Sequence, residues 1–137
     1  MPTTGRFRVD PDDPRPLYIQ VMDEIRIAIV NRGLNGDDPL PSVRELAGEL
    51  RLNPNTIQQA YRELEREGVL YVRRGRGTYV SPDVRAADLR SPLVRELAER
   101  VLREAARTGV GTEELIESIR QAARPGSEPK PRHEDVE

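Results

Sequence analysis

The sequence has no cysteine and no tryptophan, and it has a single histidine among its 137 residues. A chain without cysteine can form neither a disulfide framework nor a thiolate metal site. His133 lies in a polar C-terminal segment, so neither a histidine metal cluster nor a serine–histidine catalytic pair is available. We therefore expect no metal, no cofactor and no catalytic residue, and we predict that the chain is not an enzyme.

Long apolar runs are also missing. No stretch of the sequence approaches the roughly 20 apolar residues of a membrane-spanning helix, and the N-terminal segment MPTTGRFRVDPDDPRP does not have the pattern of a signal peptide. We expect a cytoplasmic protein that does not associate with a membrane. The hydrophobic content of 36% is modest. The expected organisation is one small domain with an appendage, in which association of two chains would bury more apolar surface.

The net charge of −2 gives the chain little overall attraction for an acidic polymer such as DNA. Contacts with phosphate need a basic face rather than a basic protein, so the position of the arginines matters more than their number. Arg73, Arg74 and Arg76 cluster in one short segment. If they are exposed, they form a basic face that the net charge conceals.

The segment Leu40–Val80 is the most informative part of the sequence, and its first signal is a helix start. Ser42 is followed three residues later by Glu45, which is the spacing of a capping box. A helix should therefore begin at Val43, where apolar residues recur at helical spacing.

A second helix start follows within the same segment. Asn53 is a good N-cap, and the proline after it suits the first helical position, which predicts a helix over Pro54–Glu67. Gly68 should end this helix as a C′ glycine. Two capped helices separated by a short turn are typical of a helix-turn-helix.

The chain changes period after the second helix. Val69–Arg73 and Thr78–Val80 alternate β-forming side chains around a loop of arginine and glycine, a pattern that predicts a hairpin. The predicted tip carries Arg73, Arg74 and Arg76, whose side chains can reach phosphates or a minor groove. Taken alone, the loop is more simply interpreted as an ordinary solvated turn. Directly after a helix-turn-helix, the wing of a winged helix is the better interpretation.

These residues carry a family resemblance. The segments LPSVRELA, NPNTIQQAYRELEREG and RRGRGTYV resemble the DNA-binding domain of GntR-family bacterial transcription regulators, over roughly Arg15–Val80. The NPNT start and the short C-terminal remainder resemble the YtrA-like subfamily in particular. The resemblance implies a dimeric repressor that binds double-stranded DNA, in a group that often acts beside genes for ATP-driven transporters.

The resemblance also implies which residues contact DNA. Ser42 and Arg44 would contact phosphate at the start of the first helix, with Arg44 also within reach of a base. The helix Pro54–Glu67 would lie in the major groove, with its N-terminal half facing the bases. The contacts expected from this helix and from the wing tip, the latter in the minor groove, are Asn55, Thr56, Gln58, Gln59, Arg62, Arg74, Gly75 and Arg76.

One departure from the family pattern concerns base preference. Many family members carry a basic residue at the position of Gln58, and the nearer relatives carry one at the position of Gln59. Both are glutamine here, and glutamine favours the edge of adenine over that of guanine. A preference for guanine is therefore not carried over to this chain.

The rest of the chain completes the predicted organisation. A helix over Pro16–Arg32, ended by Gly33, should support the winged domain, and Asp83–Arg90 should be a link. The predicted regions are a disordered N-terminal tail over residues 1–14, the winged helix-turn-helix domain over residues 15–82, a helical dimerisation region over residues 88–124 and a disordered C-terminal tail over residues 125–137.

Two helices are predicted after the link, over Ser91–Arg107 and Thr112–Ala123, with Ser91 as the N-cap of the first. They carry more apolar surface than two helices can hide against each other, so a second copy of the chain is the expected partner. The alternative is that they pack back onto the winged domain. The residues predicted to form the dimer contact are Leu93, Leu97, Val101, Leu115, Ile116 and Ile119.

These inferences combine into one prediction. The chain should be mainly α with a small β-hairpin, a winged helix-turn-helix followed by a two-helix dimerisation unit. As a homodimer it should bind an inverted-repeat operator and regulate transcription. Two alternatives remain open: a winged-helix module that binds a protein partner, and a DNA-binding protein of replication or plasmid maintenance. The sequence specifies neither the operator, nor the regulated genes, nor a small-molecule effector.

Overall fold

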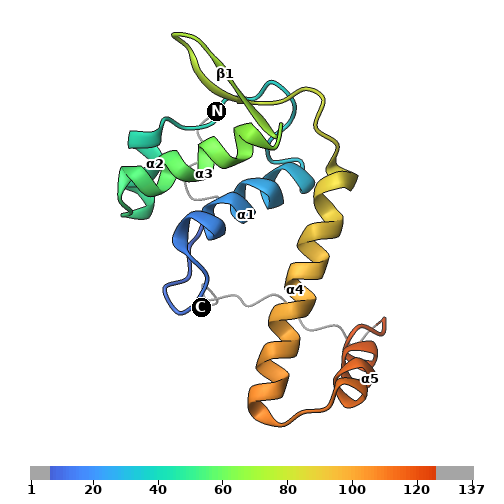
Figure 1. Cartoon of the computed structure of the whole chain (residues 1–137). Helices are drawn as coiled ribbons and strands as arrows, with labels where there is room; N and C mark the ends of the chain where they lie inside the picture. The colour runs from blue at the N-terminus through green and yellow to red at the C-terminus, as the bar shows by residue number, and fades with distance from the viewer. Residues whose placement is uncertain (1–6, 126–137) are drawn as a thin grey trace, which may run out of the picture. The chain divides into compact units, whose positions relative to one another are not determined.

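A computed structural model describes residues 7–125 of the chain. In this range the chain is mainly helical with one two-stranded antiparallel sheet (Figure 1), which confirms the predicted fold class. None of the described helices is long and apolar enough to cross a membrane. The elements in order are α1 (Leu17–Val30), α2 (Val43–Leu50), α3 (Pro54–Arg66), β1 (Leu70–Arg73), β2 (Gly77–Val80), α4 (Ala86–Thr108) and α5 (Thr112–Ala122).

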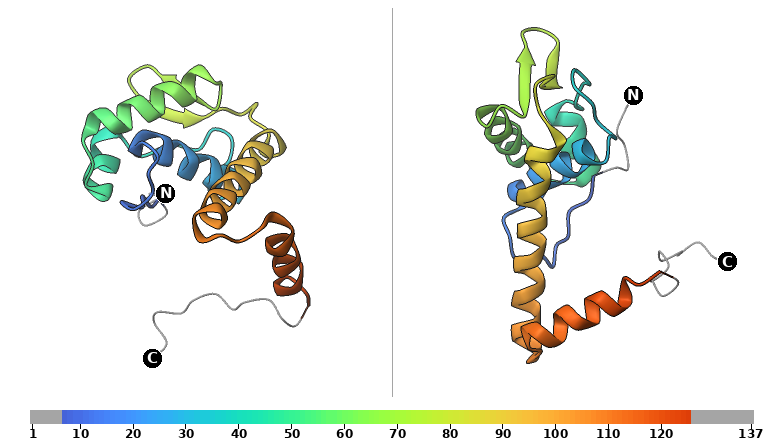
Figure 2. Two further views of the ribbon diagram at one scale, coloured as in Figure 1. Left: turned by 60° about the horizontal axis from the view of Figure 1, so that its bottom comes forward. Right: turned by 90° about the vertical axis from the view of Figure 1, so that its right-hand side faces the viewer.

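The chain divides into two compact units between Val94 and Arg95. We call residues 7–94 the winged unit and residues 95–125 the C-terminal unit. In the winged unit α1 packs against α3, α2 packs against α3, and β1 follows α3 (Figure 2). The core that they enclose is aliphatic, and its largest fully buried side chains include Ile25, Leu46, Ile57, Leu64 and Leu70. Burial of each such side chain contributes about 1.5–3 kcal/mol.

The two predicted helix starts are confirmed. Ser42 Oγ accepts the amide of Glu45 at 3.0 Å, and the Glu45 carboxylate accepts the amide of Ser42 at 2.9 Å, which completes the capping box of α2. Asn53 Oδ1 accepts the amide of Asn55 at 2.8 Å at the start of α3. These bonds satisfy amides that a helix N-terminus otherwise leaves without partners.

The predicted end of α3 is confirmed as well. Gly68 has a φ of 84°, a left-handed conformation that suits glycine because it has no Cβ. Its amide donates to the carbonyl of Glu65, and the amide of Val69 donates to that of Leu64. This pair of bonds is a Schellman motif. It turns the chain sharply from α3 into β1 and buries Val69.

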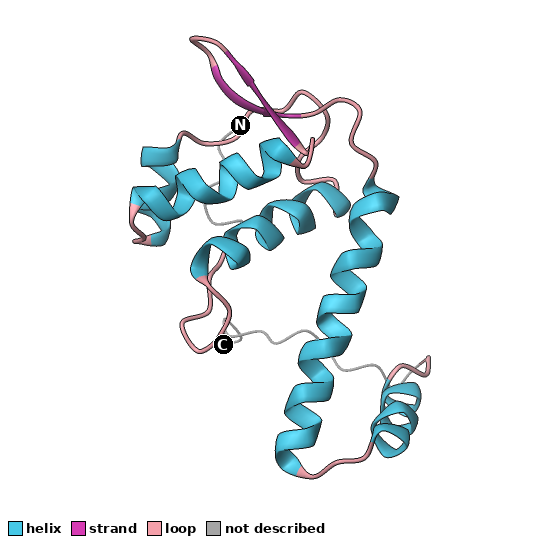
Figure 3. Ribbon diagram, in the orientation of Figure 1, coloured by secondary structure: helices cyan, strands magenta, loops and turns pink. Residues whose placement is uncertain are grey.

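The hairpin is antiparallel, with Leu70 opposite Val80 and Tyr71 opposite Tyr79. It is the only strand structure in residues 7–125 apart from an isolated bridge between Pro39 and Tyr79 (Figure 3). The bridge belongs to the loop before α2, whose Leu40 amide donates to the carbonyl of Thr78 at 2.8 Å. The free edge of β2 is therefore covered by this loop.

The prediction of a disordered tail over residues 1–14 is wrong for residues 7–14; the remainder lies outside the described residues. Phe7 is 6% exposed and belongs to the core. The amide of Arg8 donates to the Glu24 carboxylate, and that of Asp10 donates to Gln20 Oε1 at 2.8 Å. One aromatic ring thus anchors a segment whose average composition is polar.

The end of α1 also differs from the prediction. The helix ends at Val30, and the left-handed residue after it is Arg32, with a φ of 64°, rather than Gly33. The amides of Gly33 and Leu34 both donate to the carbonyl of Ala28, and Leu34 is buried in the core. Burial of this leucine offsets the roughly 1–2 kcal/mol that a left-handed non-glycine residue costs.

The predicted link over Asp83–Arg90 and the predicted N-cap at Ser91 are wrong. α4 begins at Ala86 and continues through Pro92. Proline inside a helix removes one backbone hydrogen bond and usually favours a helix start. Here Leu89 lies on the first turns of α4 and is buried in the core of the winged unit, so tertiary packing favours the longer helix. The predicted tail over residues 125–137 lies, except for Pro125, outside the described residues.

Two Gly→Ala substitutions should change stability in opposite directions. Gly68→Ala should lower the free energy of unfolding by about 1 kcal/mol, because the Cβ of alanine is strained at the left-handed φ of 84°. Gly48→Ala should raise it by roughly 0.5–1 kcal/mol, because Gly48 lies inside α2 with nothing within 4 Å of an added Cβ. Urea unfolding followed by circular dichroism measures both, and equal effects of the two substitutions would contradict the assigned backbone roles.

Candidate nucleic-acid interface

The start of α2 presents the first group of predicted site residues. Ser42 and Arg44 are both exposed. The Ser42 hydroxyl oxygen already accepts the amide of Glu45, so its own proton remains for donation to an external acceptor. Free amides and the partial positive charge of a helix N-terminus favour an anion at this position. The start of α2 is therefore suited to a phosphate.

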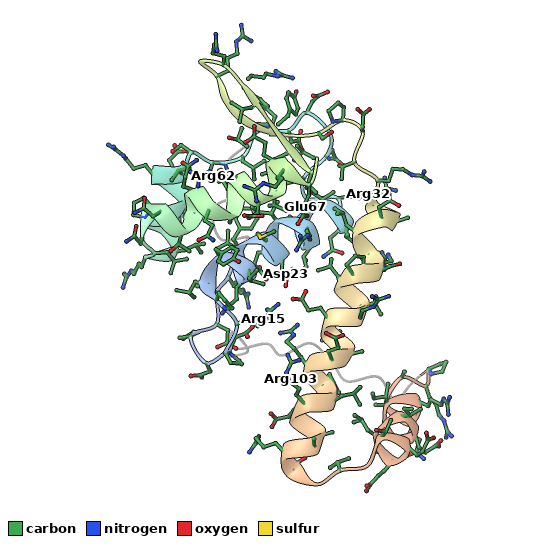
Figure 4. All side chains as sticks on the ribbon, viewed as in Figure 1. Arg15, Asp23, Arg32, Arg62, Glu67 and Arg103 are labelled. Carbon is green, nitrogen blue, oxygen red and sulfur yellow. The ribbon has the colours of Figure 1, made fainter. Side chains whose placement is uncertain are left out.

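The outer face of α3 presents the second group. Asn55, Gln58, Gln59 and Arg62 are all exposed, and Figure 4 labels Arg62 on this helix. Since each residue turns the helix by about 100°, these four side chains fall on one side. The opposite side is buried and comprises Ile57, Ala60, Tyr61 and Leu64. We call the four polar residues the α3 outer face; Thr56 lies at its edge and is half-buried.

Two polar contacts fix α3 relative to its neighbours. The Tyr61 hydroxyl donates to the carbonyl of Pro41 at 2.7 Å, which ties α3 to the residue before the α2 cap. Burial raises the pKa of this hydroxyl above its usual range, so it stays a donor at physiological pH. Arg26 of α1 donates to Glu67 at 2.8 Å and to the buried Asp23 at 2.9 Å. Figure 4 labels both carboxylates, Glu67 and Asp23. α3 is thereby held at its middle and at its C-terminal end.

The wing tip presents the third group. Arg74, Gly75 and Arg76 are exposed at the turn of the hairpin, where Figure 4 shows nitrogen-tipped side chains extending outward. Gly75 has a φ of 77°, and the Arg76 amide closes the turn on the carbonyl of Arg73 at 2.8 Å. A tip of this kind can approach a nucleic-acid backbone closely.

The third predicted tip arginine, Arg73, does not lie at the tip. Its guanidinium packs 4.2 Å from the centroid of the Tyr79 ring and donates to the Tyr71 hydroxyl at 2.6 Å. It also donates to Asp37 at 3.3 Å. The sequence analysis missed Asp37, Tyr71 and Tyr79. Strand alternation places Tyr71 and Arg73 on one face, but Asp37 comes from a distant loop that no local pattern connects to the hairpin.

The arginines of the candidate interface differ from many others in the chain. Within residues 7–125 no acidic side chain forms an ion pair with any of them. They are Arg44, Arg62, Arg74 and Arg76. By contrast, Arg15, Arg26, Arg66 and Arg107 all have carboxylate partners. Four exposed arginines without a carboxylate partner thus lie on α2, α3 and the wing, the three elements that the sequence predicts to contact DNA.

The predicted dimer residues lie on α4 and α5. Leu97 and Ile119 are 53% and 52% exposed, and Val94 and Leu102 are exposed as well. Leu93, Val101, Leu115 and Ile116 are half-buried. None of the residues of α5, all of which the structure describes, is buried. Both helices therefore keep apolar side chains in contact with solvent in the single chain.

The sequence matches the family model of bacterial regulatory proteins of the gntR family over residues 17–80. It is 39% identical over 107 residues to the HTH-type transcriptional regulator YhcF of Bacillus subtilis, which covers 77% of this chain and 88% of that protein. It is 35% identical over 117 residues to the HTH-type transcriptional repressor YtrA of the same organism, with coverages of 84% and 90%.

Solved structures agree with these sequence matches. A GntR family transcriptional regulator from Listeria monocytogenes superposes with a TM-score of 0.65 at 37% identity, over 80% of this chain and 97% of that one. The AraR DNA-binding domain in complex with operator ORX1 superposes with a TM-score of 0.51 at 30% identity, over 56% of this chain and 98% of that one.

Proposed function

This chain belongs to the gntR family of bacterial regulatory proteins, in its YtrA-like branch, and we propose that it represses transcription as a homodimer bound to an inverted-repeat operator. The observation that carries the proposal is the α3 outer face. Four polar side chains project from the side of the helix opposite its buried stripe. Unpaired arginines flank them on α2 and at the wing tip. In this arrangement one surface can contact base edges and phosphates at the same time.

The proposed roles follow from position. The α3 outer face enters the major groove, where Gln58 and Gln59 present amides to base edges and Arg62 reaches the backbone. Ser42 and Arg44 hold phosphate beside it. The wing tip lies over the minor groove, where Arg74 and Arg76 supply positive charge. The relative whose structure includes an operator, the AraR domain, supports duplex DNA as the ligand of this fold.

The dimer is proposed from the C-terminal helices. Leu97 and Ile119 are about half exposed in one chain, as are Val94 and Leu102, and exposed apolar side chains that gather on neighbouring helices favour an interaction surface. A second copy that supplies the same face in return gives a closed two-fold pair. Such a pair carries two α3 helices, which predicts an operator made of two inverted half-sites.

Two other functions were open from the sequence alone. A module that binds a protein partner would expose aromatic side chains at its interface, whereas the α3 outer face carries amides and a guanidinium. A replication or plasmid-maintenance protein would bind DNA in the same way, but the relatives that match over most of their length are named as transcriptional regulators. We propose genes for ATP-driven transporters as targets, on the YtrA-like resemblance. Mapping the bound sites in the genome tests that choice.

The proposal is tested by a base-preference experiment on the two glutamines. Gln58→Ala and Gln59→Ala should each weaken binding to the preferred operator by about 1–3 kcal/mol if the residue makes paired hydrogen bonds to adenine. The loss should be confined to one base pair in each half-site, because other positions are read by other residues. Selection of bound sequences from a random duplex library measures the preference.

The control is a wing variant with Arg74→Gln and Arg76→Gln. It should weaken binding to all duplexes alike and flatten the dependence of affinity on salt, since it removes phosphate contacts and no base contacts. Both glutamine variants keep the net charge and should keep the wild-type salt dependence. If they select the wild-type motif unchanged, direct reading by Gln58 and Gln59 is wrong.

A further inference from the structure

One face of the wing holds a cluster of four side chains that we call the wing cluster: Asp37, Tyr71, Arg73 and Tyr79. The rings of Tyr71 and Tyr79 lie side by side with their centroids 5.9 Å apart. The Arg73 guanidinium lies 5.4 Å from the first centroid and 4.2 Å from the second. The Tyr71 hydroxyl donates to Asp37 Oδ1 at 2.5 Å and accepts from Arg73 Nη2 at 2.6 Å.

Asp37 is presented to this cluster by a fixed loop. Its amide donates to the carbonyl of Val80 at 2.7 Å, and the amide of Val80 donates to the backbone carbonyl of Asp38 at 2.9 Å. Gly36, just before it, lies so close to the chain leaving β2 that an added Cβ would stand 2.9 Å from the Cα of Pro82. Asp37 itself has a φ of 69°, a conformation that aspartate tolerates better than most residues. The loop therefore holds a carboxylate against the wing.

The cluster separates Arg73 from the other two arginines of the wing. Arg74 and Arg76 extend from the tip without a carboxylate partner among the described residues. Arg73 has hydrogen bonds to a hydroxyl and to a carboxylate, and its guanidinium plane is covered by a ring. Asp37 brings one negative charge to the same place.

We propose that Asp37 and Tyr71 hold the Arg73 side chain on the wing and that the Asp37 carboxylate offsets its charge. The wing then offers two arginine charges to DNA instead of three. This inference rests on the DNA-binding function proposed above. Non-specific affinity for DNA comes from neutralised phosphates, whereas useful specificity is the ratio between operator and other sequences. Restraining one charge of the wing lowers affinity for all sequences without touching the glutamines that read bases.

The test is a pair of isosteric charge changes. Asp37→Asn keeps an oxygen that accepts from Tyr71 but removes the charge that balances Arg73. It should raise affinity for a random duplex several-fold and steepen the slope of log affinity against log salt by about 0.9, the value for one further phosphate contact. Arg73→Gln should not steepen the slope, because it leaves the charge of Asp37 without a partner. The double variant should return to the wild-type slope.

The matched control is Asp83→Asn, which removes an equal charge at an exposed residue outside the wing cluster. It should change the slope much less than Asp37→Asn does. A double variant with a slope flatter than that of wild type would show that Arg73 already contacts phosphate and would overturn the proposal. An Asp37→Asn variant that binds like wild type, or like the Asp83→Asn control, would overturn it too.

A measurement without DNA separates this inference from the proposed function. The hydrogen bond to Asp37 raises the pKa of the Tyr71 hydroxyl above its ordinary value. In wild-type protein carrying ¹³C-labelled tyrosine, the Tyr71 signal should titrate above its ordinary range, and Asp37→Asn should lower its pKa. An ordinary Tyr71 pKa in wild type would overturn the wing cluster alone. A wild type with no salt-dependent duplex binding would overturn the proposed function and this inference with it.

Discussion

A full-length chain carrying Leu97→Glu and Ile119→Glu should be a monomer and should bind its operator roughly 100-fold or more weakly than wild type. Both side chains are about half exposed in the single chain, so replacing them should leave the winged unit folded. A glutamate at either position would lose its water at an apolar contact between two chains. The free energy of that desolvation is larger than the free energy that the apolar contact contributes. Light scattering and a duplex titration measure the two effects.

The size of the binding effect follows from linkage of the two half-sites. In a dimer, binding of the first winged unit places the second near its half-site at a high effective concentration, which contributes a factor of about 10²–10⁴ without any new contact. A monomer loses that factor but keeps every contact within one half-site. The variant should therefore bind a single half-site with the affinity of one wild-type winged unit.

The control is Ala106→Glu, which adds the same charge on the side of α4 opposite Leu97, at an exposed residue. It should remain a dimer and bind like wild type. A double glutamate variant that stays dimeric would place the chain-to-chain contact elsewhere. A wild-type monomer would remove the proposed dimer altogether.

Local signals predicted the helix-turn-helix closely, because its ends are decided within a few residues. The capping box at Ser42, the cap at Asn53 and the left-handed Gly68 each satisfy backbone groups through neighbours in sequence. The hairpin was equally predictable from the sequence, since alternation of side chains and a glycine-containing turn are also local signals.

The errors have the opposite character, because each depends on one distant contact. Phe7 orders an N-terminal segment that its polar composition marks as disordered, and Leu89 draws the start of α4 upstream past Pro92. Leu34 enters the core and leaves Arg32, not Gly33, in the left-handed conformation. Burial of a single apolar side chain outweighs the local preference in each case.

The candidate interface shows the same division. The family motifs named the residues of α2, α3 and the wing tip, and the structure leaves nearly all of them exposed. Sequence alone grouped Arg73 with the tip arginines, since the three lie within four consecutive residues. Only the fold brings Asp37 across to Arg73, and this contact changes what the wing presents to a ligand.

Arg44→Ala should weaken operator binding by about 1–3 kcal/mol while the fold stays intact. Arg44 lies in the first turn of α2, is exposed, and forms no ion pair within residues 7–125. Loss of its charge should therefore leave no carboxylate of the folded chain without a partner. At a helix N-terminus beside the α3 outer face, the same charge is free to meet a phosphate and to reach a neighbouring base.

The matched control is Arg32→Ala, which removes an equal charge from an exposed residue after α1, apart from Arg62, α2 and the wing tip (Figure 4). Arg32→Ala should change binding only slightly, through long-range attraction that is screened over about 10 Å at 0.1 M salt. Arg44→Ala should lose affinity at every salt concentration and also flatten the salt slope by up to about 0.9. Gel-shift titrations at several salt concentrations, with circular dichroism of both variants, make the comparison. If the two variants bind equally and both remain folded, Arg44 does not contact DNA, and the start of α2 loses its place in the interface.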